Sequence, residues 1–431
     1  MAETDFSLPD GTHTVVLGVG DLNGIMRGKR IPATHWDTIC KSGNALSIAL
    51  FAIDMTCDVW DTPYVSFDNG YPDCHIFPMT RPATIPWEPG VAMAMARAEG
   101  MDHKPVPIDP RTVLIAQVDR AQAMGFQVKV GTEVEFYLLD PETKKPRDAG
   151  IGVYSLDRAA ELEHVLGPIR QQINEMGIPV EQSNPEYAAG QVEVNLRYGD
   201  ALAAADRLVM FRSLVKQLAM QHGYMATFMA KPFFEESGNG FHTHHSLWKD
   251  GANVFSDGGK LSATGLSYLA GMQAKMPEMA ICGATTPNAY RRYQPFSFCP
   301  TNTTWGIDNR TVGLRVIHGS DSAVRVEKRT GAADCNPYLL IAAEIAAGLD
   351  GIEQGMTPTA ETTGNGYLDE EATPLPADIA TAIELARGSD WLKGVLGDLV
   401  HELLLQQADR EVEFVASQVT PVEVDRYLGN F

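Results

Sequence analysis

Residues 238–248 read GNGFHTHHSLW, and this stretch concentrates three of the 11 histidines of a 431-residue chain. Alternating apolar and polar residues are typical of a β-strand, in which successive side chains point to opposite faces. His242 and His244 would then share one face, and His245 would point to the other. The pattern alone leaves three possibilities open: the histidines bind a metal, bind a phosphate, or pack.

Three other stretches show the same alternation of charged and apolar residues. They read TEVEFYLL (132–139), GQVEVNL (190–196) and VRVEKRT (324–330). On the polar faces of these predicted strands lie Glu133 and Glu135, then Gln191, Glu193 and Asn195, then Arg325, Glu327 and Arg329. Glu186 precedes the second stretch in the predicted loop NPEYAAG (184–190).

A single strand with acids on one face is usually a solvated sheet face, and a histidine beside a phenylalanine is more often a core residue. Four strands that repeat the pattern favour a site instead. Hard divalent cations prefer carboxylate oxygens with an occasional imidazole, whereas structural zinc prefers cysteine. Arginines bind phosphate or carboxylate in a bidentate manner. Together these residues predict a site for a metal ion and a nucleotide.

The composition excludes several classes of partner. The net charge is −21, with 55 acidic against 34 basic residues, which argues against nucleic acid and anionic membranes. The six cysteines form no C-x-x-C pair and are interpreted as reduced, buried thiols. The acidic start MAETDFSLPD does not resemble a secretory signal, and no stretch of 18 apolar residues occurs without a charge. A cytoplasmic location is expected.

The chain divides at a proline-rich stretch, HKPVPIDPR (103–111), and we expect two domains, at 1–105 and 106–431. The first reads as short strands and turns. The second alternates strands with helices predicted at 111–125, 157–177, 201–223 and 336–352. Asp200 and Asn336 stand at N-cap positions of the last two, and Gly125 and Gly177 end the first two.

The motifs in combination resemble the glutamine synthetase family of type I architecture, over nearly the whole chain. They are E-x-E, N-P-E-x-x-x-G-Q-x-E, G-N-G-F-H-x-H-x-S-L, N-R-x-x-x-x-R, and R-V-E-x-R followed by N-P-Y-L. The γ-glutamylpolyamine synthetase branch is the most similar. This resemblance implies an α+β fold, with a small N-terminal β-grasp domain and a large catalytic domain containing an antiparallel sheet. It also implies active sites between neighbouring subunits of a double-ring dodecamer.

The resemblance also implies residue roles. A first Mg²⁺ or Mn²⁺ would be held by Glu135, Glu186 and Glu193. A second would be held by Glu133, His242 and Glu327. His244, Arg315 and Arg325 would bind ATP, with Arg310 assisting the phosphoryl group in transfer. Gly238, Arg292 and Arg329 would bind the amino-acid substrate, and His245 would pack or form a pocket wall.

Two features bear on the amine substrate. Glutamine synthetases carry a glutamate in the flap after the substrate arginine, whereas this segment reads YQPFSFCP (293–300) and contains no acid. Ser297 and Phe298 take the candidate positions, and the aromatic residues would either contact the carbon chain of an organic amine or pack the loop. A separate feature concerns the acidic substrate: Ser237 stands where glutamine synthetases usually have an asparagine beside that substrate, which leaves open whether the acid is glutamate itself. Asp54 is the candidate acid that assists the amine in a neighbouring subunit.

The leading hypothesis is an ATP-dependent ligase that joins glutamate to a polyamine or alkylamine through a γ-glutamyl phosphate, with two to three divalent ions per site. The alternatives are a glutamine synthetase that uses ammonia, which the missing flap acid disfavours, and a catalytically silent regulatory oligomer. The complete set of six proposed metal ligands argues against the silent protein.

Overall fold

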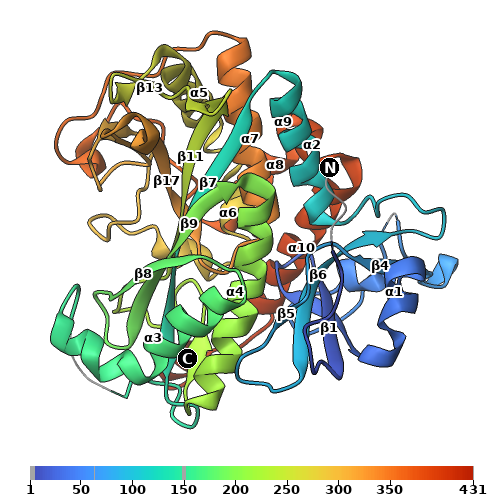
Figure 1. Cartoon of the computed structure of the whole chain (residues 1–431). Coiled ribbons are helices and arrows are strands. Elements are labelled where there is room, and N and C mark those ends of the chain that lie inside the picture. The colour runs from blue at the N-terminus through green and yellow to red at the C-terminus, as the bar shows by residue number, and fades with distance from the viewer. Residues whose placement is uncertain (1–4, 63, 148–151, 431) are drawn as a thin grey trace.

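The computed structural model describes residues 5–62, 64–147 and 152–430. It has the expected α+β fold, with two large sheets, one small hairpin, and helices packed around the larger sheet (Figure 1). The predicted boundary between residues 105 and 106 lies in the connection between the last strand of the first sheet and helix α2 (Pro110–Ala123).

The first sheet is formed by residues 14–99. Its strands are β1 (Thr14–Gly20), β2 (Met26–Pro32), β3 (Asn44–Ser47), β4 (Asp73–Pro78), β5 (Ala83–Thr84) and β6 (Val91–Glu99). The order is β2-β1-β6-β4-β3, with β1 and β6 parallel and the other pairs antiparallel. Helix α1 (Trp36–Ser42) contacts β4. Leu17, Ile76 and Met95 are fully buried in its core.

The second sheet carries the four charged strands. Its members are β7 (Gln127–Leu139), β8 (Val180–Pro185), β9 (Gln191–Asp200), β10 (Met225–Thr227), β11 (Gly240–Lys249), β12 (Ala252–Asn253), β15 (Trp305–Ile307), β16 (Leu314–Ile317) and β17 (Arg325–Ala332). The order is β15-β16-β17-β11-β7-β9-β8. The four predicted strands are therefore consecutive neighbours in one sheet, although they are far apart along the chain. A small hairpin of β13 (Ser256–Asp257) and β14 (Lys260–Leu261) lies apart from it.

Helices pack around this sheet and on one another. They are α3 (Leu156–Glu175), α4 (Ala201–Gln221), α5 (Ala263–Lys275), α6 (Ala280–Gly283), α7 (Pro337–Glu353), α8 (Ile379–Arg387), α9 (Asp390–Leu396) and α10 (Asp398–Ala416), whereas α11 (Pro421–Tyr427) follows on the C-terminal arm. All four predicted helices are confirmed. Asn336 caps α7 as expected, because its side chain accepts hydrogen bonds from the backbone amides of Tyr338 and Leu339.

Two expectations from the sequence were wrong. Asp200 stands at the N-cap of α4 but makes no capping bond, because its carboxylate accepts a hydrogen bond from Gln127 on the neighbouring strand at 2.7 Å. The cysteines all have free thiols, but Cys57 is exposed and Cys40 only half-buried, because both lie in the small domain, on a loop and on a short surface helix. The other four are buried as predicted.

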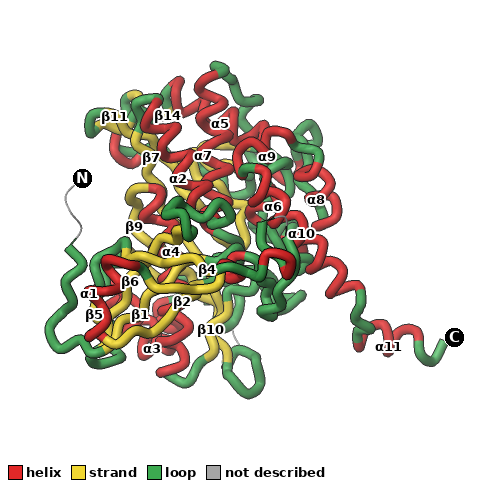
Figure 2. Tube along the Cα trace, turned by 90° about the vertical axis from the view of Figure 1, so that its right-hand side faces the viewer, coloured by secondary structure: helices red, strands yellow, loops and turns green. Residues whose placement is uncertain are grey.

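Polar contacts join the loop after β1 to helices α7 and α10 of the larger part of the chain. The Asn336 side chain donates to the carbonyls of Asp21 and Leu22, and Gln407 of α10 hydrogen-bonds Asn23. Beyond this contact α10 continues outward, and α11 projects away from the rest of the molecule (Figure 2). Within the described residues, no helix combines the length and apolarity that crossing a membrane requires.

Candidate active site

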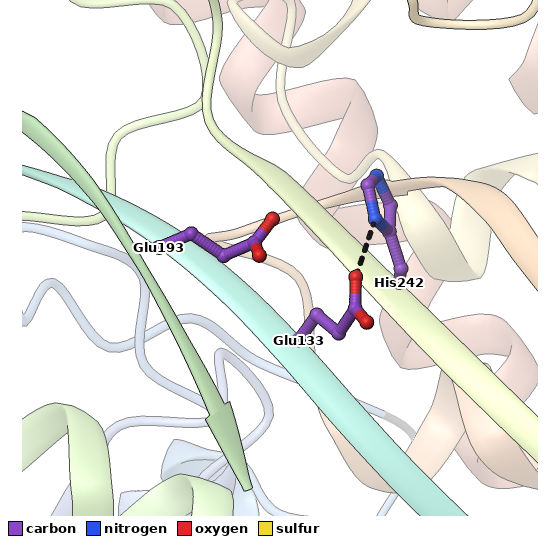
Figure 3. Close-up of side chains that lie close together, drawn as sticks. All are labelled: Glu133, Glu193 and His242. Atoms are coloured by element: carbon purple, nitrogen blue, oxygen red, sulfur yellow. Dashed lines mark hydrogen bonds and ion pairs between the residues drawn. The ribbon is translucent and has the colours of Figure 1, made fainter. Parts of the chain in front are cut away.

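Cross-strand pairing brings the charged residues of the four strands together. His242 of β11 pairs with Glu133 of β7, and Glu135 of β7 pairs with Glu193 of β9. Directly opposite residues of an antiparallel pair have Cβ atoms about 4.5–5.5 Å apart, so their side chains contact one another. Figure 3 shows Glu193, Glu133 and His242 converging from three adjacent strands.

A first group of potential metal ligands consists of Glu135, Glu186 and Glu193. Each offers a carboxylate oxygen, and these oxygens lie within 4.8 Å of one another. Glu135 is oriented by the backbone amide of Gly240, which donates to its carboxylate at 2.6 Å. The set matches the first metal site expected from the sequence.

A second group surrounds Glu133. His242 Nδ1 lies 3.3 Å from a Glu133 oxygen and 3.5 Å from a Glu327 oxygen. His244 Nε2 lies 2.9 Å from the other Glu133 oxygen, and His244, Glu133 and Glu327 also offer ligand atoms within 4.8 Å of one another. His244, which the sequence assigned to ATP, therefore stands as near to these carboxylates as His242 does.

The electrostatics of the first group fit a divalent cation. Burial and the neighbouring Glu133 and Glu135 raise the pKa of Glu193 to about 9. Burial and the charge of Glu135 raise the pKa of Glu186 to about 7. Carboxylates packed this closely repel one another, and a hard cation coordinated by their oxygens removes that repulsion.

Neighbouring cations keep the second group ionised. Burial alone would raise the pKa of Glu327, but the Arg329 guanidinium and the two histidines outweigh it and hold the pKa at about 2. The pKa of Glu133 is likewise held well below its usual range, because the charges and hydrogen bonds of His244 and His242 outweigh burial. These two carboxylates are charged at any physiological pH.

We expect metal binding to release about one to two protons per subunit at pH 7, because Glu186 and Glu193, with pKa values of about 7 and 9, must ionise to coordinate. Affinity for Mg²⁺ or Mn²⁺ should therefore rise with pH up to about 9. In the metal-free protein the raised pKa values mean that the folded chain binds more protons than the unfolded one, so this contribution to stability falls as pH rises from about 4.5 to 9.

Titration calorimetry in buffers of different ionisation enthalpy measures the protons released. An apparent enthalpy that does not depend on the buffer, together with an affinity that does not change with pH, would contradict the assignment of these two carboxylates.

Three of the predicted arginines contact the second group. Arg329 pairs with one Glu327 oxygen at 2.5 Å, and Arg315 donates to the other at 3.0 Å. Arg325 Nε donates to His244 Nδ1 at 3.3 Å. Arg310 is exposed and lies near Asp308. The pKa of Asp308 is lowered by its hydrogen bond to Arg315 and by the charges of Arg315 and Arg310.

Arg292 is a buried cation with unsatisfied donors. Only 4% of the residue is exposed, and its Nε and Nη1 groups have no hydrogen-bond partner among the described residues. Gly238 makes room for it, since a Cβ there would stand 2.6 Å from Arg292 Cγ. A buried guanidinium with free N–H groups is a receptor for a carboxylate.

A cavity of about 410 Å³ opens beside the second group. Glu133, His244 and Arg325 line its inner end, and Tyr198 offers an aromatic ring. Its wall also includes Gly131, Glu181, Asn195, Ser246 and Ser322.

Comparison with known proteins identifies this arrangement. The family profile of the glutamine synthetase catalytic domain matches residues 107–427. A glutamate–isopropylamine ligase of a Pseudomonas species is 33% identical, over 98% of this chain and 96% of its own. The chain belongs to the glutamine synthetase family. The family resemblance predicted from the motifs is thus confirmed.

Further glutamine synthetase relatives place the chain in the branch of γ-glutamyl-amine ligases. A γ-glutamylethanolamide synthetase of Streptomyces coelicolor is 35% identical over 96% of this chain and 92% of its own. A γ-glutamylputrescine synthetase of Escherichia coli is 33% identical over 97% and 92%. A solved structure described as a GmaS/ADP complex has a TM-score of 0.87, 30% identity and 97% coverage of both chains. The protein is accordingly an ATP-dependent carbon–nitrogen ligase.

Residues 293–300 form the segment that carries the flap acid in glutamine synthetases, and the two candidate positions in it, Ser297 and Phe298, make different contacts. The Ser297 hydroxyl donates to the Gln294 carbonyl at 2.6 Å, so it holds the loop together. Phe298 is 46% exposed and stacks on Tyr187 with ring centroids 5.9 Å apart. Phe296 is 66% exposed and packs on Tyr367. Phe298 thus stacks on the residue that follows Glu186, a potential metal ligand, in the chain.

Asp54, proposed from the glutamine synthetase pattern to assist the amine, lies in the small domain. Its Oδ1 accepts hydrogen bonds from the amides of Thr56 and Asp58, and its Oδ2 lies 3.5 Å from Arg410 of α10. Burial alone would raise its pKa, but these hydrogen bonds outweigh burial and lower it. Asp54 is thus a charged group better suited to attracting a cation than to accepting a proton.

The sequence analysis did not predict the roles of two residues, Tyr187 and Glu344. Tyr187 follows Glu186 directly in NPEYAAG, but nothing in the sequence indicates that it stacks on Phe298. Glu344 is the single acid in the apolar first turns of α7, and it is fully buried behind the sheet that carries the candidate metal ligands. His245 packs there as predicted, with its Nε2 2.8 Å from a Glu344 oxygen.

Proposed function

We propose that the protein joins the side-chain carboxylate of glutamate to a primary organic amine, through a γ-glutamyl phosphate formed from ATP. ADP and phosphate are the other products. A carboxylate does not react with an amine at neutral pH, so one carboxylate oxygen first attacks the γ-phosphate of ATP and displaces ADP, which gives an acyl phosphate with phosphate as the leaving group. The amine then attacks the activated carbonyl, phosphate departs, and one proton is lost from the new amide nitrogen.

The observation that carries this proposal is the position of Arg292. Its Nε and Nη1 groups are buried without a partner, its side chain lies against Gly238 and Gly240, and the Gly240 amide donates to the proposed ligand Glu135. An acidic substrate bound there lies beside the carboxylates that would hold the cation. Arg329, whose Nε is also buried without a partner, offers a second contact to the substrate.

Glu135, Glu186 and Glu193 would hold one Mg²⁺ or Mn²⁺, and Glu133 and Glu327 with His242 or His244 would hold a second. Such ions neutralise the phosphate charges of ATP and the charge that develops during transfer. The nucleotide would occupy the 410 Å³ cavity, whose lining includes Arg325, His244 and Tyr198; Arg325 and His244 would bind its phosphates, and the Tyr198 ring would contact its base. Arg310 and Arg315 would stabilise the transferred phosphoryl group.

The amine arrives as a cation, since alkylamines have a pKa of about 10, and it must lose one proton to solvent before its nitrogen can attack the acyl phosphate. Asp54 of a neighbouring subunit would attract it by charge. The wall formed by Tyr187 and Phe298 would contact its carbon chain, and the face of each ring attracts a cation. The names of the relatives, which act on isopropylamine, ethanolamine and putrescine, support an organic amine over ammonia.

The proposed assembly is a dodecamer of two hexameric rings, with active sites between subunits. The C-terminal arm projects from the rest of the molecule in Figure 2, and it supports association because it carries exposed apolar side chains. These are Phe414, Val415, Val419, Val422, Val424, Tyr427 and Leu428. Apolar side chains gathered on a projecting segment are typical of a contact with another subunit.

We expect phosphate release to require glutamate, ATP, a divalent ion and an amine together, and mass spectrometry of the products to show a γ-glutamyl amide. The panel of amines is ammonia, methylamine, ethanolamine, isopropylamine, putrescine and spermidine, each compared by kcat/KM. Fastest turnover with ammonia would favour a glutamine synthetase. No turnover with any amine, despite a bound nucleotide, would favour a silent regulatory protein.

A further inference from the structure

A buried polar cluster lies behind the active-site strands. Its centre is Glu344 of α7, which is fully buried. One of its oxygens accepts a hydrogen bond from the Thr243 hydroxyl at 2.9 Å and lies 2.8 Å from His245 Nε2. The other lies 3.2 Å from Lys328 Nζ. The Tyr268 hydroxyl of α5 lies 3.1 Å from the remaining ring nitrogen of His245.

Every strand residue in this cluster alternates with a residue of the candidate metal site. Thr243 lies between His242 and His244 on β11, and Lys328 follows Glu327 on β17. The cluster and the metal ligands therefore occupy opposite faces of the same two strands. A side chain that fixes the residues on one face of these strands therefore also fixes the direction of the metal ligands on the opposite face.

The contact falls next to an irregularity in the pairing of β11 with β17. Phe241 pairs with Gly331, but Thr243 pairs with Lys328, so two residues of β17 oppose the single residue His242. This is a β-bulge, and the Thr243–Lys328 pair is the first regular pair after it. The next pair is His244 with Glu327, both within the second metal group.

We propose that Glu344 is a positioning residue, which binds Thr243 and Lys328 together across the bulge and so keeps His244 and Glu327 facing the same cation. A slip of one residue at a bulge turns every following side chain to the other face. Buried ionic groups are best attested in this role of selecting one register. The inference rests on the metal site of the proposed function.

The test uses Mn²⁺ alone and two variants, with a third as control. Glu344→Gln removes the charge that holds Lys328, and Thr243→Val removes one hydroxyl and keeps the side-chain shape. Asp350→Asn is the control, because Asp350 lies on the same helix and pairs with Arg120 and Trp391 away from the site. Dissociation constants for Mn²⁺ are measured by calorimetry, and backbone hydrogen exchange of residues 240–249 and 325–332 is measured in metal-free protein.

We expect Glu344→Gln to weaken Mn²⁺ binding by about tenfold and Thr243→Val by a few-fold, both with faster exchange in these two strands. Asp350→Asn should change neither quantity. Wild-type affinity and exchange in folded Thr243→Val and Glu344→Gln would overturn the inference, and if Glu344→Gln does not fold, Thr243→Val decides alone. Failure of the wild-type protein itself to bind Mn²⁺ would instead overturn the proposed metal site.

Discussion

Glu327→Ala is expected to reduce turnover by about a thousandfold or more while the subunits still fold and associate. Glu327 is fully buried and is held by Arg315 and Arg329, with His242 3.5 Å away. Its loss removes a carboxylate from the second metal group and takes from Arg329 its carboxylate partner, while Arg315 keeps only Asp308. Both changes remove the charge balance on which an ATP-phosphate site depends.

Breaking a buried ion pair also destabilises a protein by about 3–5 kcal/mol, so the variant needs a matched control. Asp206→Asn provides this control. Asp206 is a buried carboxylate outside the candidate site, and it accepts two hydrogen bonds from Arg111. Phosphate release, Mn²⁺ affinity and particle mass by light scattering are measured for both. Near wild-type phosphate release by Glu327→Ala would refute the role of Glu327 at the metal site.

Catalytic efficiency is expected to be roughly 15- to 60-fold higher for an alkylamine or diamine than for ammonia. The loop 293–300 contains no acid to attract ammonium. Phe298 and Tyr187 instead offer stacked, exposed rings beside Glu186. Each buried methylene contributes about 0.8 kcal/mol, so two or three methylenes account for a preference of this size.

Phe298→Ala should remove most of this preference by lowering kcat/KM for the organic amine while leaving that for ammonia nearly unchanged. Phe296→Ala is the matched control, since Phe296 lies in the same loop with a similarly positive φ but packs on Tyr367. Phe298→Glu would restore an acid to the loop and shift preference toward ammonia. Substitution at Ser297 is less informative, because its hydroxyl holds the loop through the Gln294 carbonyl.

Equal losses in Phe298→Ala and Phe296→Ala would mean that both rings only pack the loop. Ammonia as the best substrate of the wild-type protein would refute the organic-amine proposal altogether. The two results are distinguishable, because the first concerns the variants and the second the unmodified chain.

The sequence by itself determined the elements and the faces of the strands. Alternation along 132–139 predicted that Glu133 and Glu135 lie opposite the buried Val134 and Phe136, and Asn336 predicted the start of α7. These features are local, because side-chain direction along a strand and capping of a helix depend on residues a few positions apart. The recurring motifs then predicted the family.

Only the tertiary structure decided which of these faces meet. The order β17-β11-β7-β9 and the bulge opposite His242 arise from backbone hydrogen bonds between residues distant in sequence, and no local pattern specifies them. The same holds for the burial of Arg292 with unpaired donors and for the stacking of Tyr187 on Phe298. Glu344 is the clearest case. In the sequence it is one acidic residue among the apolar residues in the first half of α7. Packing of α7 behind the sheet buries its charge, and a buried charge is stable only with polar partners. Lys328, Thr243 and His245 provide these partners.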